Sequence, residues 1–167
     1  EDVMGAIGKD SSLNLYSLER RLLIVNNLPG ATIKDAQVSA GQRPETTDLT
    51  VTIDKTQRIN GFVVADNYGS NYIGRHRLSA GIDINSPFGL GDKISLGGLI
   101  SEGQYLKNYR ASYSSLLSPS GLTGQISASR TRYELGDSFD SLDAVGTANI
   151  YEAGLAYPFI FTRDLIM

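Results

Sequence analysis

The feature that most constrains this chain is an alternation of apolar and polar residues that begins near residue 57 and continues towards the end. A period of two places alternate side chains on opposite faces of a β-sheet. No helical pattern follows residue 30, so this part is predicted to be antiparallel β structure. We expect six strands, near residues 57–66, 72–86, 92–102, 107–117, 121–134 and 147–158.

The length of these segments and the character of their two faces indicate where the sheet lies. The clearest segment sets His76, Leu78, Ala80, Ile82 and Ile84 against Arg75, Arg77, Ser79, Asp83 and Asn85. Strands of about ten residues suit a tilted crossing of a bilayer, whereas soluble strands are nearer five or six. The apolar face is light, with Ala, Gly and Ile, as a lipid-facing surface permits. We therefore predict that lipid meets the apolar face and that the polar face lines a water-filled lumen.

The connections support this interpretation. The turns at 85–92 and 117–121 are compact, while the connection at 135–147 is longer and polar, as expected outside the cell. Aromatic residues are expected at the two membrane interfaces. The outer set is Tyr72, Tyr109 and Tyr151, and the inner set is Phe88, Tyr157 and Phe159.

The first third of the chain has a different pattern. Leucines and a valine recur at helical spacing, at positions 15, 18, 22 and 25, after cap-type residues at 10–12. Pro29 and Gly30 end this helix. Two strands follow at 31–40 and 48–54, and we expect them to pair as a hairpin. A helix and a hairpin indicate the rear half of a small α+β domain.

Composition excludes several classes of function. The formal net charge is −3, which does not favour nucleic-acid binding, and there is no cysteine. His76 is the one histidine, so we expect no metal site and no cofactor, with His76 near the outer rim. Nucleotide-binding and serine-hydrolase motifs are missing, and we expect no enzyme activity. No apolar run approaches the roughly 20 residues of a spanning helix, and from the opening Glu-Asp-Val-Met we expect no signal peptide in this sequence.

Three stretches together resemble one known family. They are Leu13 to Gly30, with its Leu-Glu-Arg-Arg and Asn-Asn-Leu-Pro-Gly segments; Asp66 to Asp92, with Pro-Phe-Gly-Leu-Gly-Asp; and Ser129 to Gly136. Their order is similar to that of the outer-membrane transporters of two-partner secretion, which export haemolysins and filamentous haemagglutinins. The resemblance implies the end of a second POTRA (polypeptide-transport-associated) module at 1–56 and the first six or so strands of a transmembrane β-barrel at 57–167. The fold class is thus a partial α+β module followed by antiparallel barrel strands, mainly β.

The resemblance also implies a longer protein and a mechanism. A plug helix and a first POTRA module would precede residue 1, and further strands would complete a barrel of about sixteen. An unfolded exoprotein client would add to the edge strand 31–40 in the periplasm and then pass through the barrel without nucleotide. The groove residues would be Leu15, Leu18, Leu22, Ile33 and Val38; plain core packing is the alternative. The expected location is the bacterial outer membrane, with the POTRA part in the periplasm.

Other interpretations stay open. Arg75, Arg77, Asp83, Lys93 and Arg110 would line the pore, either solvating the client or pairing among themselves. Arg130 and Arg132 would meet lipopolysaccharide phosphates or project above the membrane. Asp137, Asp140 and Asp143 would bind calcium weakly or remain a solvated loop. The alternative functions are a barrel-assembly factor of the same superfamily, a β-rich surface adhesin, whose apolar face would pack on a second sheet, or an envelope phospholipase.

Overall fold

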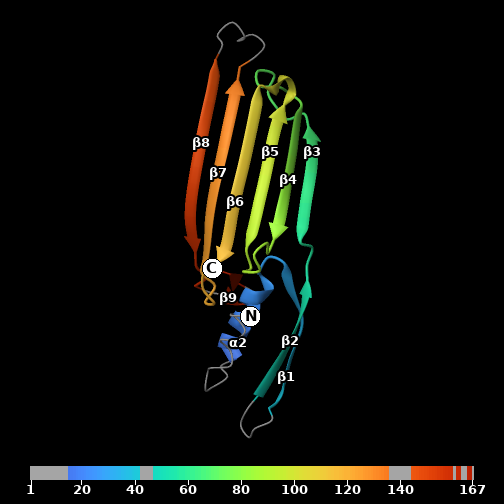
Figure 1. Ribbon diagram of the computed structural model, residues 1–167, viewed down its shortest axis with the longest axis vertical. Helices are drawn as coiled ribbons and strands as arrows, with labels where there is room; N and C mark the ends of the chain where they lie inside the picture. Colours follow the sequence, from blue (N-terminus) through green and yellow to red (C-terminus); the bar gives the residue numbers. More distant parts are fainter. Residues whose placement is uncertain (1–14, 42–46, 136–143, 160, 163–164, 167) are drawn as a thin grey trace.

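The computed structural model describes residues 15–41, 47–135, 144–159, 161–162 and 165–166, and it contains one helix and a series of antiparallel strands (Figure 1). Helix α2 spans Leu15–Asn26, and strands β1 (Ala31–Ala40) and β2 (Thr47–Lys55) pair as a hairpin. The predicted helix and hairpin are thereby confirmed. We call α2, β1 and β2 the helix–hairpin module.

A six-stranded antiparallel sheet follows, in the order β3-β4-β5-β6-β7-β8. Its strands are β3 (Ile59–Asp66), β4 (Arg77–Asn85), β5 (Lys93–Ser101), β6 (Leu106–Leu116), β7 (Thr123–Glu134) and β8 (Val145–Ala156). A short 3-10 helix, η2 (Glu102–Gln104), joins β5 to β6. Two-residue strands, β9 (Phe161–Thr162) and β10 (Leu165–Ile166), pair with each other near the end.

Five of the six predicted strands begin and end within two residues of the observed bounds. The segment predicted at 72–86 is the exception, because β4 begins at Arg77. Gly74 has a φ of 89°, a left-handed conformation that breaks the strand. The loop is held by hydrogen bonds from the Gly69 amide to the Arg75 carbonyl and from the Ser101 hydroxyl to the Ile73 carbonyl.

Cross-strand register confirms the predicted faces of the sheet. Ile82 lies opposite Leu96, Leu96 lies opposite Ala111, and Tyr113 lies opposite Ile126, so these apolar residues share one face. Asp83, Ser95 and Ser112 share the other face in the same way. We call these the apolar face and the polar face. Not every residue on the polar face is polar, since the Phe62 ring lies against Gly81.

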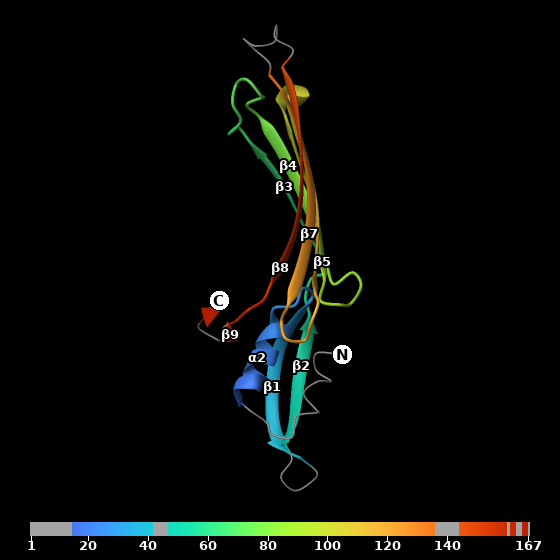
Figure 2. The ribbon, with the colours of Figure 1, turned by 90° about the vertical axis from the view of Figure 1, so that its left-hand side faces the viewer.

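No second protein layer covers the sheet within the described residues, as the side view makes plain (Figure 2). On the apolar face, Leu78, Ile82, Leu96 and Ile126 keep 45%, 39%, 46% and 59% of their surface exposed. The adhesin alternative predicted that these side chains would pack against a second sheet, and within the described residues they do not. Among the described residues the buried apolar ones are Leu18, Ile24 and Val25, and all three belong to α2.

The two ends of the sheet differ. The β4–β5 and β6–β7 turns face the helix–hairpin module, whereas η2 and the C-terminal end of β7 lie at the opposite end (Figure 1). We call these the module end and the far end. The calcium candidates Asp137, Asp140 and Asp143 lie outside the described residues.

Candidate functional site

The groove predicted between the helix and strand 31–40 corresponds to the contact of α2 with β1. Leu18 is buried and Leu22 and Ile33 are half-buried, so these three pack into the module. Val38 is 58% exposed, which leaves it free to meet another chain. Leu15 is the first residue of α2.

A β-bulge sets the face that β1 presents. Ile33 and Val38 are an odd number of residues apart, so a regular strand would place them on opposite faces. The register shifts between Ile33 and Asp35, where Lys34 has no partner opposite. This extra residue brings both side chains to one face, with Ile33 opposite Ile53 and Val38 opposite Leu49. The bulge thereby makes β1 apolar on one side.

Within the described residues β1 pairs on one side alone, with β2. At the start of its other edge, the Ile33 amide donates a hydrogen bond of 3.0 Å to the Asn26 side chain at the end of α2. The rest of that edge offers backbone donors and acceptors to an incoming strand, which is the geometry of β-augmentation.

The module is fastened to the sheet through Arg20 on α2. Its Nη2 donates to the carbonyl oxygens of Pro158 at 2.7 Å and Ser120 at 3.3 Å, and to the Tyr157 hydroxyl at 3.2 Å. Nη1 donates to the Phe159 carbonyl at 3.4 Å, and the guanidinium lies 5.5 Å from the centre of the Tyr157 ring. One side chain thus bridges the helix, the β6–β7 turn and the segment after β8. We call this contact region the junction.

A second contact of the junction involves the β4–β5 turn. Gly91, with a φ of 65°, lies so close to Leu28 that a Cβ there would come within 2.7 Å of Leu28 Cδ2. Asp92 is fully buried, and its carboxylate accepts hydrogen bonds from the amides of Phe88 at 3.3 Å and Leu90 at 3.1 Å. The carboxylate therefore shapes the turn against which Leu28 packs.

Sequence reasoning missed the junction. The sequence pattern assigned no role to Arg20. The compact turns were the available signal, because the module docks on the end of the sheet where both of them lie (Figure 1). Asp92 closes the Pro-Phe-Gly-Leu-Gly-Asp motif, but the sequence does not reveal that its side chain is buried.

The polar face carries four of the five residues predicted to line a pore: Arg77, Asp83, Lys93 and Arg110. Lys93 and Asp83 form an ion pair at 2.9 Å, so the self-paired alternative describes these two. Arg77 pairs with Asp66 at 2.8 Å, directly across the ladder. Arg75 lies in the loop before β4, so its assignment to the polar strand face was wrong.

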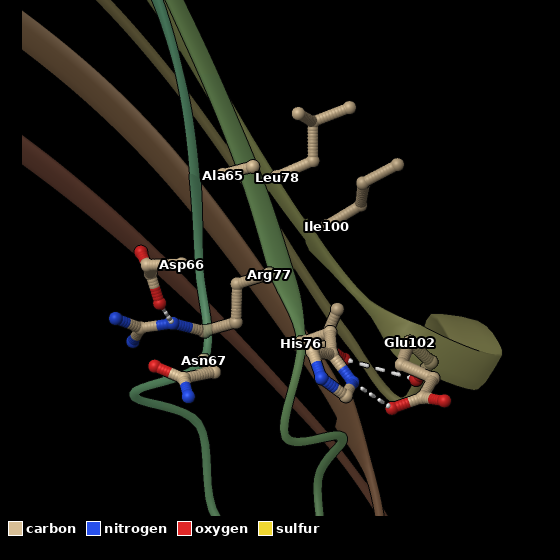
Figure 3. Close-up of a pocket in the computed structure, with 9 residues that line it drawn as sticks. Ala65, Asp66, Asn67, His76, Arg77, Leu78, Ile100 and Glu102 are labelled. Atoms are coloured by element: carbon tan, nitrogen blue, oxygen red, sulfur yellow. Dashed lines mark hydrogen bonds and ion pairs between the residues drawn. The ribbon is translucent and has the colours of Figure 1, made fainter.

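His76 lies at the far end, as expected, on the rim of an open groove (Figure 3). Its Nδ1 is 2.9 Å from Glu102 Oε2, which ties the β3–β4 loop to η2. The hydrogen bond and charge of His76 hold the pKa of the Glu102 carboxyl below its usual value. Leu78 and Ile100 point away from the Asp66–Arg77 pair, because the two pairs lie on opposite faces of the sheet (Figure 3).

Two features are absent from the described residues. No cluster of three or more His, Cys, Asp or Glu residues there is arranged to hold a metal ion. No helix there has the length and hydropathy to cross a bilayer.

A model of the haemolysin secretion/activation proteins ShlB/FhaC/HecB matches residues 45–164. The chain belongs to this family, the transporters of two-partner secretion, and the family is not enzymatic. The resemblance noted in the sequence is confirmed.

Curated relatives and a solved structure agree. The chain is 36% identical over 147 residues to the heme/hemopexin transporter protein HuxB of Haemophilus influenzae strain 86-028NP, covering 88% of this chain and 26% of that protein. HuxB of strain KW20/Rd is 34% identical over the same length. CdiB from Escherichia coli shares the fold with a TM-score of 0.72 at 23% identity, covering 90% of this chain and 28% of CdiB. The chain thus spans about a quarter of the length of these relatives.

Proposed function

We propose that the chain is part of an outer-membrane translocator that captures an unfolded exoprotein in the periplasm and passes it through a β-barrel pore. Residues 1–56 form the end of a POTRA module, and residues 57–167 form the first strands of the barrel. The six strands become a closed pore with the further strands that full-length relatives have room for. The exposed apolar face supports insertion in lipid, because such a large bare surface is costly in water.

One observation carries the capture step: within the described residues one edge of β1 has no partner strand, and the junction holds this module at the end of the sheet where the two compact turns lie. An extended client adds to this edge by backbone hydrogen bonds, which tolerate many sequences. Val38 offers it an apolar contact. The client bound there is already next to the module end of the polar face.

The transfer step uses the polar face of the sheet. Ser, Asn and Gln side chains, together with Arg110 and the Lys93–Asp83 pair, give a hydrated wall along which a polypeptide can slide. No nucleotide is needed, because folding of the client outside the cell makes its return unfavourable. The client is proposed as a secreted exoprotein of the kind that two-partner secretion exports.

The test uses the full-length transporter and its exoprotein. Val38→Asp places a charge on the exposed apolar position, and Gln37→Asp places the same charge one residue away on the opposite face. We expect Val38→Asp to weaken client binding about tenfold and to reduce secretion, because a buried unpaired charge is unfavourable. Gln37→Asp should leave both unchanged. Equal behaviour of the two variants would contradict capture at β1.

A further inference from the structure

Three basic residues lie on the apolar face near the far end of the sheet. They are Lys107 on β6 and Arg130 and Arg132 on β7. Lys107 is directly opposite Arg132, and Tyr109 is directly opposite Arg130, so the three cations form one patch across two neighbouring strands. They share their face with Ala111 and Ala128, which are paired further along the same ladder. We call Lys107, Arg130 and Arg132 the basic patch.

The basic patch has no internal counter-charge. None of its residues forms an ion pair or a side-chain hydrogen bond with another residue in the part of the chain that the structure describes. Glu134 lies on the same face of β7, yet it forms no ion pair with Arg132. Like charges directly opposite in an antiparallel ladder destabilise it. The charges of the Lys93–Asp83 pair on the other face, by contrast, compensate each other. Among the described residues no anion compensates the basic patch, and an anion from outside the chain would do so.

The depth of the basic patch follows from the aromatic residues beside it. Tyr109 and Tyr151 are exposed on the same face, as the aromatic residues of an outer interfacial girdle would be. Arg130 lies level with Tyr109, and Arg132 and Lys107 lie two residues beyond, about 7 Å along the strand and about 5 Å along the membrane normal at a tilt of about 45°. The interfacial layer is about 5–7 Å thick on each side of the hydrocarbon. The patch thus falls among headgroups and not above them.

We propose that the basic patch binds the phosphate groups of lipopolysaccharide in the outer leaflet. This inference rests on the proposed function, which places the module end in the periplasm and the far end at the cell surface. Arginine forms paired hydrogen bonds with phosphate, and two arginines with a lysine between neighbouring strands match a doubly phosphorylated headgroup. The patch would hold one lipid against β6 and β7 and fix the depth of the sheet in the membrane.

The experiment uses the full-length transporter in detergent and diphosphoryl lipid A as the probe, with dephosphorylated lipid A and phosphatidylglycerol as comparisons. The test variant carries Lys107→Gln, Arg130→Gln and Arg132→Gln together. Arg110→Gln on the polar face of β6 is the matched control. Each basic residue near an anionic membrane surface contributes about fivefold, so the triple variant should lose on the order of a hundredfold in affinity. The control should keep its affinity.

The outcomes separate this inference from the proposed function. Unchanged lipid A binding in the triple variant, or an equal loss of binding in Arg110→Gln, would overturn the proposal that the basic patch binds lipid A. Equal binding of phosphatidylglycerol, or of dephosphorylated lipid A, would overturn the assignment to lipopolysaccharide phosphate. Client secretion, measured in the triple variant, reports on the proposed function alone, because no residue of the basic patch lies on the polar face along which the client is proposed to pass. A thermal unfolding profile close to that of the unsubstituted protein shows that the triple variant is folded.

Discussion

Arg20 on the helix donates its shortest hydrogen bond, 2.7 Å, to the main-chain carbonyl of Pro158, 138 residues later in the chain. This hydrogen bond joins α2 to the segment after β8, although all six strands of the sheet lie between them in the sequence. Because the acceptors are mostly carbonyls, the contact depends on the reach and the fork of the guanidinium more than on any particular partner side chain.

Replacing Arg20 should loosen the module from the sheet. Arg20→Ala removes four hydrogen bonds of a half-buried side chain, and we expect a loss of about 1–3 kcal/mol in docking. The chain has no cysteine, so spin labels on Thr50→Cys and Gln125→Cys report the distance between module and sheet. That distance distribution should broaden. Glu19→Ala, an exposed neighbour on the same helix, is the control, and equal broadening there would argue against Arg20 as the fastener.

The bulge in β1 can be tested by its residue count. Deleting Lys34 leaves Ile33 and Val38 four residues apart, an even spacing that keeps both side chains on one face of a regular strand. The deletion should therefore change the stability of the module by less than about 1 kcal/mol. Lys34→Ala keeps the bulge and loses only the exposed contact with Asp54 at 3.6 Å, so its effect should also be small. Chemical denaturation followed by hydrogen exchange of the module amides compares the two. A loss of about 2 kcal/mol or more in the deletion variant alone would mean that Lys34 is not the extra residue of the strand.

The buried carboxylate of Asp92 should be needed for the β4–β5 turn. Asp92→Ala leaves the amides of Phe88 and Leu90 without an acceptor, and each buried unsatisfied donor costs about 1–3 kcal/mol. Asp92→Asn retains one acceptor oxygen and should cost less. Amide exchange at residues 88–90 measures the difference. A turn equally protected in the alanine variant would contradict this role.

The His76–Glu102 contact predicts an acid sensitivity at the far end. The pKa of Glu102 is lowered in the folded protein, so the contact stabilises the rim above the usual pKa of the carboxyl and is lost as the pH falls through the lowered value. Proteolysis or amide exchange of η2 should therefore increase in acid, and Glu102→Gln should abolish that dependence. The effect should be small, because both side chains are exposed. An unchanged acid profile in Glu102→Gln would assign the sensitivity to another group.

The sequence was enough to predict the strands and their faces, because apolar and polar residues alternate wherever the two faces of a sheet meet different environments. Leu96 and Ile126 could be assigned to the apolar face without coordinates. Local backbone geometry was harder to predict. The left-handed Gly74 shortens β4, and Lys34, which has no partner residue in the ladder, changes which side chains of β1 share a face. The junction was beyond reach, because the partners of Arg20 are carbonyl groups, which every residue carries and no pattern marks.

Every ladder in the six-stranded sheet joins strands that are consecutive in the chain. Each new strand therefore needs only a short loop to be closed, and the entropic cost of each closure is small. The sheet can be assembled hairpin by hairpin in the order of synthesis, with no segment threaded through another. A chain delivered to the membrane from one end could thus begin to fold before its remaining strands arrive.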